Sequence, residues 1–203
     1  MRSSWIIVAG VAIALIAGVA AFWAVSGMIE SPPVAESEGR PLIGGDFELV
    51  NHAGDTVTNQ TFEGSNRLIY FGYTYCPDVC PLSLSAMTAA YDELPEDVQN
   101  EVVPLFITVD PERDTVEAIA DYVSLFHPDL VGLTGSTEQV DDAADTYRVY
   151  YQLNKPDEYG DYLVDHSSFT YLMDGEGNYL THFGHGTQAD EMAQGITAAV
   201  RGS

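Results

Sequence analysis

Residues 70–81, YFGYTYCPDVCP, contain both cysteines of the chain. Residues 68–71 are all apolar, which is typical of a strand buried on both faces of a sheet. The residues that follow the cysteines repeat apolar positions at helical spacing. Pro81 suits the first turn of that helix, because its missing N–H would be unpaired there. We therefore predict a strand–loop–helix junction, with Cys76 in the loop and Cys80 near the start of the helix.

The same two patterns alternate through the rest of the sequence. Alternating strands and helices predict an α/β fold in which a helix joins each pair of parallel strands. A turn-forming sequence at residues 174–178 predicts a terminal hairpin. The expected strands are a small hairpin within 47–58, then 68–71, 102–109, 130–133, 169–173 and 179–183, and the expected helices are 84–94, 115–126, 137–150 and 188–200.

The N-terminal stretch has the character of a membrane anchor. Residues 5–29 carry no charged side chain, and a transmembrane helix needs about 20 apolar residues. Trp5 and Trp23 lie near the two ends, where aromatic rings favour the membrane interface. Arg2 precedes the run and acidic residues follow it. We therefore predict that residues 1–30 form one transmembrane helix with its N-terminus in the cytoplasm.

A cleaved signal peptide is the alternative for this stretch, with Ala24-Val25-Ser26 as the cleavage site. The apolar run is longer than the usual apolar region of a signal peptide, about 7–15 residues, which favours an uncleaved anchor. Residues 31–41, SPPVAESEGRP, have the composition of a flexible tether. Residues 42–203 then form one domain, which is long enough to bury a core.

The charge balance narrows the possible functions. Lys and Arg number 7 against 31 Asp and Glu, a formal net charge of −24. A protein that follows the phosphates of a nucleic acid needs a basic face, so nucleic-acid binding is excluded. Such acidity attracts cations or a basic partner. Two cysteines are too few for a small domain built on disulfides.

The two cysteines are separated by three residues, and this spacing leaves three interpretations open. One helical turn brings their Cα atoms to a distance of about 6 Å, which is compatible with a structural disulfide. A pair of exchanging thiols is chemically sound, because a helix N-terminus favours the thiolate form. The same two sulfurs also suit one metal ion, but a metal site needs a further ligand.

Among the five histidines, His166 is the best candidate for such a ligand. It lies in the sequence DHSSF, residues 165–169, in an expected loop immediately before a strand. The others have ordinary settings: His52 in a turn, His127 before a proline, His182 in a strand and His185 between two glycines.

Three stretches together resemble the SCO/SenC family of membrane-anchored copper chaperones for cytochrome c oxidase. They are residues 70–81, residues 108–115 (TVDPERDT) and residues 165–167 (DHS). Residues 47–49, with Gly54 and Thr58, also fit the family, and the resemblance extends over residues 42–200.

The resemblance implies a thioredoxin-like fold with an N-terminal β-hairpin extension, and copper bound by Cys76, Cys80 and His166. It implies delivery of that copper to the binuclear centre of cytochrome c oxidase subunit II, or to another copper-site protein. The expected location is a bacterial inner membrane, crossed once, with the domain in the periplasm. The alternative is a thiol–disulfide oxidoreductase in which Cys76 and Cys80 reduce the copper-ligand cysteines of the partner.

The chemistry of these side chains agrees with the implied ligands. Two thiolates and an imidazole suit Cu(I), tolerate Cu(II) and also suit zinc, so the resemblance and not the ligand set selects copper. Asp165 is a candidate for orienting His166 through a hydrogen bond, and Asp78 for assisting proton transfer. For both aspartates the alternative is an ordinary solvated charge.

Overall fold

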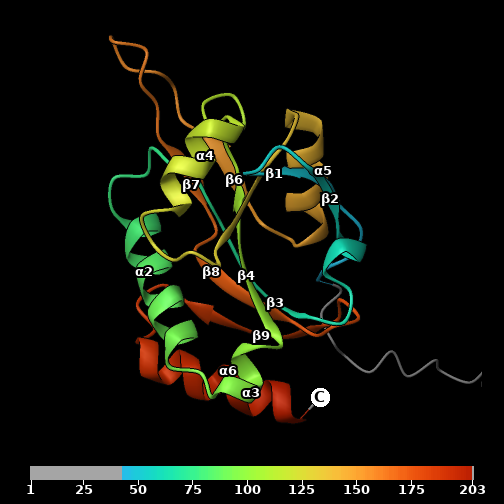
Figure 1. Cartoon of the computed structure of the whole chain (residues 1–203). Coiled ribbons are helices and arrows are strands. Elements are labelled where there is room, and N and C mark those ends of the chain that lie inside the picture. Colours follow the sequence, from blue (N-terminus) through green and yellow to red (C-terminus); the bar gives the residue numbers. More distant parts are fainter. Residues whose placement is uncertain (1–42, 203) are drawn as a thin grey trace, which may run out of the picture. The chain divides into compact units, whose positions relative to one another are not determined.

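A mixed seven-stranded sheet forms the centre of the structure, a computed structural model that describes residues 43–202 (Figure 1). β4 pairs in parallel with both β3 and β5, and the other neighbouring strands run antiparallel. Across the sheet the order is β2 (Thr56–Thr58), β1 (Glu48–Asn51), β5 (Val131–Thr134), β4 (Val102–Thr108), β3 (Asn66–Gly72), β8 (Phe169–Met173) and β9 (Tyr179–Gly184).

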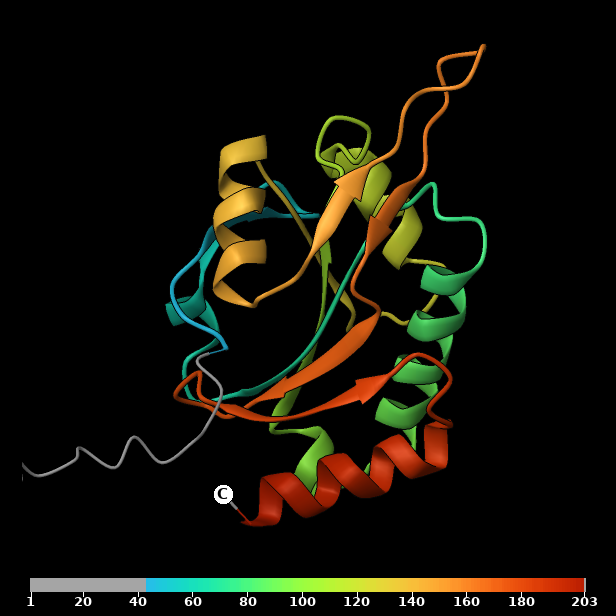
Figure 2. The ribbon, with the colours of Figure 1, turned by 180° about the vertical axis from the view of Figure 1, so that it is seen from behind.

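The helices surround this sheet. α2 and α6 lie side by side, α4 packs on β5, and α5 packs on β1 (Figures 1 and 2). Their bounds, with those of the short 3-10 helix η1, are η1 (Asn59–Phe62), α2 (Val79–Asp92), α3 (Glu96–Gln99), α4 (Val116–Val123), α5 (Thr137–Thr146) and α6 (Ala189–Gly202).

The two central parallel strands place two loops at one edge of the sheet. All seven residues of β3 are buried, as expected for a strand covered on both faces. β3 and β4 are in register from Asn66 opposite Val102 to Gly72 opposite Thr108, so they end together. The loop with the cysteines, which follows β3, therefore emerges beside residues 109–115, which follow β4.

Most of the predicted elements are confirmed. The expected hairpin within 47–58 is the β1–β2 pair, and helical crossovers do join the parallel strands β3, β4 and β5. The prediction of one helix over 137–150 is wrong at its end, because α5 stops at Thr146. Arg148 has a φ of 56°, a left-handed conformation that ends a helix.

A second, two-stranded sheet contradicts the expectation of a loop before residue 169. β6 (Tyr151–Leu153) and β7 (Val164–His166) pair antiparallel, with Tyr151 opposite His166. His166 is thus the last residue of a strand, and its predicted loop position is wrong. Strands of three residues are too short to show an alternating pattern. The connection between them projects from the rest of the domain (Figure 2).

The predicted membrane anchor, residues 1–30, and the predicted tether, residues 31–41, lie outside the described residues. Within residues 43–202, none of the helices has both the length and the apolar character needed to cross a membrane.

Candidate metal centre

The cysteines lie where β3 gives way to α2. Cys76 precedes the helix and is half-buried, whereas Cys80 is the second residue of α2 and is 0% exposed. Both are free thiols, and the backbone N–H of Cys80 donates to Cys76 Sγ at 3.3 Å. Gly72 leaves room for the buried sulfur, because a Cβ atom there would lie 3.0 Å from Cys80 Sγ.

His166 reaches this pair from β7. Its Nε2 atom lies 3.3 Å from Cys80 Sγ, and its Nδ1 lies 3.0 Å from the carbonyl oxygen of Ser167. A carbonyl oxygen only accepts, so this bond requires a proton on Nδ1, and in the neutral imidazole the lone pair of Nε2 then faces the sulfur. The rings of Tyr70 and Tyr73 meet the imidazole edge-on, with centroids at 6.2 and 5.9 Å.

The three side chains form a compact donor set. Cys76 Sγ, Cys80 Sγ and a ring nitrogen of His166 all lie within 4.8 Å of one another, and within residues 43–202 this is the one such cluster of three or more potential ligands. One ion can contact two thiolates and one imidazole at this spacing. The donors are soft to borderline, a set suited to copper and acceptable to zinc.

The two thiols differ in acidity. The contact with Cys80 is the main cause that lowers the pKa of Cys76 to about 3, against the opposing effect of burial. The same contact, together with burial, raises the pKa of the Cys80 thiol above its ordinary value. The contact therefore favours the thiolate form of Cys76 and the thiol form of Cys80. Since metals bind thiolates, a thiol that becomes a metal ligand must release its proton.

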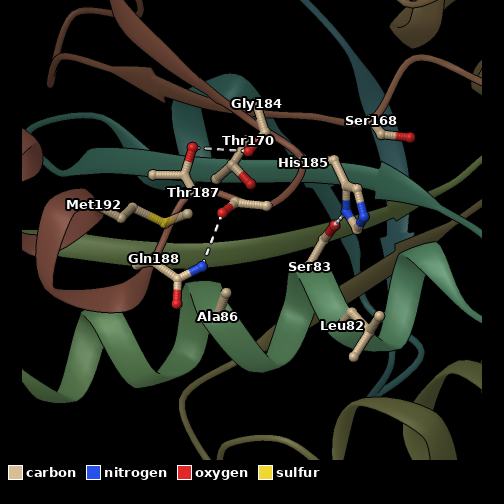
Figure 3. Close-up of a pocket in the computed structure, with 11 residues that line it drawn as sticks. Leu82, Ser83, Ala86, Ser168, Thr170, Gly184, His185, Thr187, Gln188 and Met192 are labelled. Atoms are coloured by element: carbon tan, nitrogen blue, oxygen red, sulfur yellow. Dashed lines mark hydrogen bonds between the residues drawn. The ribbon is translucent and has the colours of Figure 1, made fainter.

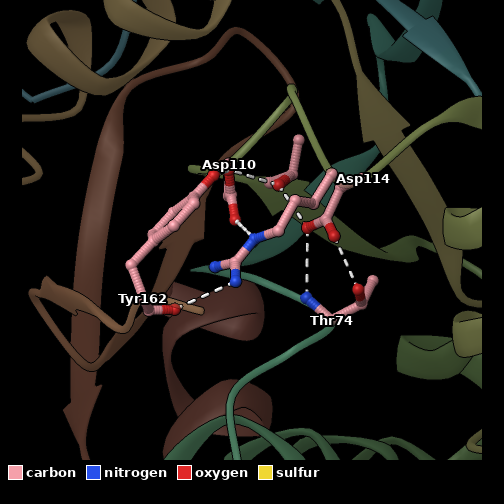
Figure 4. A network of polar contacts seen from close by, with 6 residues as sticks. Thr74, Asp110, Asp114 and Tyr162 are labelled. Carbon is pink, nitrogen blue, oxygen red and sulfur yellow. Dashed lines mark hydrogen bonds and ion pairs between the residues drawn. The ribbon is translucent and has the colours of Figure 1, made fainter. Parts of the chain in front are cut away.

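Asp114 ties the cysteine loop to the segment after β4 (Figure 4). Its buried carboxylate accepts hydrogen bonds from Thr74 N at 3.1 Å, Thr74 Oγ1 at 2.5 Å and Thr108 Oγ1 at 2.6 Å. Burial is the main cause that raises the pKa of Asp114. Because Thr74 lies two residues before Cys76, this network fixes the path of the loop.

The two aspartates considered from the sequence have other settings. Asp78 is the N-cap residue of α2, but its exposed side chain makes no capping hydrogen bond. Asp165 is exposed on β7, and the group that orients the His166 ring is the Ser167 carbonyl. The hypothesis that Asp165 orients the imidazole is therefore wrong.

The other four histidines lie outside the cluster. His185 borders a cavity of about 260 Å³ between α2, β8 and the start of α6, where its Nδ1 lies 3.0 Å from Ser83 Oγ (Figure 3). His52 Nδ1 accepts from Gly132 N, and His182 Nδ1 contacts Tyr179 Oη. His127 is paired with Asp92 and Asp129.

No individual residue of 108–115 is assigned a function from the sequence. Asp110, Arg113 and Asp114 belong to a polar network that also includes Thr74 and Tyr162 (Figure 4). The sequence does contain a pattern that indicates this network: charged residues directly follow a buried strand that runs parallel to the strand before the cysteines. Side chains at the carboxyl ends of neighbouring parallel strands meet at one edge of a sheet.

Comparison with known proteins gives a consistent result. The SCO1/SenC family model matches residues 35–201. Protein SCO1 homolog, mitochondrial, of Homo sapiens is 47% identical over 164 residues, 80% of this chain and 54% of that protein. This chain therefore spans about half the length of that relative.

Two solved structures of Sco proteins are similar to this chain over most of the described domain. Arabidopsis thaliana ScoI with copper bound is 42% identical with a TM-score of 0.72, and the match covers 79% of this chain and 99% of that one. Yeast Sco1 with copper bound is 36% identical with a TM-score of 0.75, covering 80% and 91%. These matches confirm the predicted α/β thioredoxin-like fold.

Proposed function

The chain belongs to the SCO1/SenC family, and from this premise we propose that it is a copper metallochaperone for cytochrome c oxidase assembly. In this proposal one copper ion is bound by Cys76, Cys80 and His166. The observation that carries it is the convergence of the two sulfurs and the imidazole nitrogen to within 4.8 Å. The two similar structures named as copper-bound support the choice of copper over zinc.

The surface around the donor set favours delivery to another protein. Seven of the eight exposed large hydrophobic side chains in residues 43–202 lie either in residues 75–82, around the cysteines, or in residues 150–169, which contain the β6–β7 hairpin and His166. Exposed apolar side chains on the segments that carry a site are candidates for contact with a protein partner. The seven are Tyr75, Leu82, Tyr150, Leu153, Tyr159, Leu163 and Phe169.

The proposed partner is the binuclear copper centre of cytochrome c oxidase subunit II. Residues 1–30 would anchor the protein in a bacterial inner membrane and residues 31–41 would tether the domain on the periplasmic side. A site of three ligands at the surface suits transfer, because ligands of the partner can replace Cys76, Cys80 and His166 one at a time. Cys76 and His166 are both partly exposed and so accessible to such exchange.

The test is copper binding by the full-length chain purified without oxygen. The wild type should hold one Cu(I) per chain against a competing chelator, whereas Cys76→Ser, Cys80→Ser and His166→Ala should each lose copper to the same chelator. His127→Ala is the matched control, since that histidine pairs with Asp92 instead. A His166→Ala protein with undiminished copper affinity would contradict the ligand assignment.

A thiol–disulfide oxidoreductase is the second candidate, and the unequal exposure of the cysteines favours it. Cys76 is accessible, whereas Cys80 is fully buried beside it. In a reduction, the Cys76 thiolate attacks a partner disulfide, which forms a mixed disulfide and frees the first partner thiolate. Cys80 then loses its proton and attacks Cys76 Sγ, which frees the second partner thiolate and leaves a Cys76–Cys80 disulfide. A deletion strain separates the two functions: added copper should restore oxidase activity if delivery limits it, and added thiol reductant if reduction does.

A further inference from the structure

The donor set is split between two parts of the domain. Both sulfurs lie at the junction of β3 and α2, where Cys80 belongs to the hydrophobic core and Cys76 packs against it. His166 ends β7, a three-residue strand whose sheet partner in residues 43–202 is the equally short β6. We propose that Arg113 is the positioning residue that holds this hairpin against the cysteine loop, and that it thereby keeps His166 within reach of copper. The inference rests on the proposed function.

Arg113 is hydrogen-bonded to the β6–β7 hairpin directly, through Tyr162, and indirectly, through Asp110. Its Nη1 donates to the backbone carbonyl of Tyr162 at 2.9 Å, and its Nε donates to Asp110 Oδ2 at 2.5 Å. Asp110 links the two residues a second time, because its Oδ1 accepts a hydrogen bond from the Tyr162 hydroxyl at 2.8 Å (Figure 4). The residue two positions before β7 is thus held by both its backbone and its side chain.

The same guanidinium faces the cysteine loop. Its carbon lies 3.6 Å from the ring centroid of Tyr162 on the hairpin, 4.8 Å from that of Tyr75 and 5.8 Å from that of Tyr73. Tyr75 immediately precedes Cys76, and the Tyr73 ring also meets the imidazole of His166. One cation therefore contacts aromatic rings from both segments that carry ligands.

The ion pair between Asp110 and Arg113 is shielded from water, which strengthens its effect on the position of the hairpin. The Asp110 side chain is 1% exposed and that of Arg113 is 18% exposed, so their ion pair is largely protected from solvent. Lysine would keep the charge, but it lacks the planar fork that bonds two acceptors at once and stacks on a ring. We therefore expect Arg113→Lys to retain part of the positioning and Arg113→Gln to retain little.

Loss of this contact should free the hairpin while both sulfurs stay in place. Partners that orient a metal ligand are typically worth about 10–100-fold in metal affinity. We expect Arg113→Gln to weaken Cu(I) binding by about this factor, with Arg113→Lys between it and the wild type. In the Cu(II)-loaded variant, electron paramagnetic resonance should show a weaker nitrogen hyperfine signal from His166.

The decisive experiment is a double-mutant cycle on the full-length chain, with Cu(I) competition against a chelator as the readout. If Arg113 acts through His166, then Arg113→Gln should weaken binding in the wild type but cause no further weakening in a His166→Ala background. Arg201→Gln is the matched control, because it removes a surface ion pair between Arg201 on α6 and Asp97 on α3.

Two results would overturn the inference: wild-type copper affinity and nitrogen hyperfine coupling in Arg113→Gln, or equal weakening with and without His166. If Arg113→Gln does not fold, the same cycle with Arg113→Lys decides, and unaltered affinity there also overturns it. Failure of the proposed function is a different outcome, since the wild type itself would then bind no copper.

Discussion

The cysteine loop and the β6–β7 hairpin bring the three proposed copper ligands to the same point, but they are built differently. The loop follows β3, a strand with seven buried residues, and it is fixed by two hydrogen bonds from Thr74 to Asp114. The hairpin has two strands of three residues and a projecting connection (Figure 1). Its attachment near β7 depends on Arg113, Asp110 and the aromatic contacts of His166.

This contrast suggests a division of tasks. We expect the loop, which is held by the core, to keep the two sulfurs in place. We expect the hairpin, which is attached by fewer groups, to move more readily, and a movement that took His166 away from the sulfurs would open the proposed site for transfer. Substitutions at the loop should therefore cost stability, whereas substitutions on the hairpin should cost copper binding or transfer with little loss of stability.

The largest loss of stability is expected for Asp114→Asn. The carboxylate accepts three hydrogen bonds, and an amide NH₂ in place of one oxygen would face donors from Thr74 or Thr108. Buried donors left without acceptors should lower the free energy of unfolding by about 2–3 kcal/mol. Urea denaturation measures this loss, and Asp165→Asn on the exposed side of β7 is the control. Equal stability of the two variants would contradict the expectation that loop substitutions cost more stability than hairpin substitutions.

A somewhat smaller loss is expected for Gly72→Ala. The added Cβ would lie 3.0 Å from Cys80 Sγ, 3.0 Å from a ring carbon of Tyr70 and 3.2 Å from one of Phe106. All three neighbours are fully buried, so overpacking should lower the free energy of unfolding by about 2 kcal/mol. Copper affinity should fall as well, because the sulfur is displaced.

Gly184→Ala provides the control for this substitution, because a Cβ at Gly184 would have no atom within 4 Å. Its unfolding free energy should stay within about 0.5 kcal/mol of the wild type. If thermal and urea denaturation gave the two alanine variants the same stability, the sulfur would not be as tightly enclosed as the distances indicate.

The two regions also differ in how far the sequence predicts them. The apolar runs of β3 and β4 and the helical spacing after the cysteines show the strand–loop–helix junction directly, and both sulfurs are placed from local residues. His166 is identified through the family resemblance, and its strand is missed. A three-residue strand is defined by its partner, and here the pairing of Tyr151 with His166 spans the hairpin connection.

The polar network is unpredictable from the sequence for a related reason. Thr74 and Asp114 are 40 positions apart, and Arg113 and Tyr162 are 49 apart. These contacts follow from the parallel register of β3 and β4 and from the path of the hairpin, neither of which a local pattern encodes. The charged residues within 108–115 indicate that this segment makes polar contacts, but a local pattern does not identify the residues that it contacts.

The His166→Ala substitution should affect stability and copper binding to very different extents. The imidazole is partly exposed and its hydrogen bonds are to Cys80 Sγ and the Ser167 carbonyl, so its removal should cost about 1 kcal/mol of unfolding free energy or less. The copper affinity should nevertheless fall far below that of the wild type, because one of three ligands is lost. A stability loss as large as that of Asp114→Asn would show that the hairpin belongs to the core.

The smallest structural effect is expected at the end of the hairpin. Tyr159 is 82% exposed, so Tyr159→Ser should leave the free energy of unfolding within about 0.5 kcal/mol and copper affinity unchanged. If the hairpin contacts the proposed partner, removing an aromatic side chain there should cost about 1–2 kcal/mol of binding free energy and slow copper transfer to that partner by about tenfold.

Leu125→Ser controls for the loss of exposed apolar surface, because Leu125 is 78% exposed but follows α4 and lies outside the segments that carry the ligands. Stopped-flow mixing of copper-loaded chain with the copper-free subunit II domain measures the transfer rate of each variant. Equal rates for both serine variants would place the docking surface elsewhere and leave the hairpin with one task, holding His166. A slow Tyr159→Ser protein with normal copper affinity would show that the hairpin both carries a ligand and recognises the recipient.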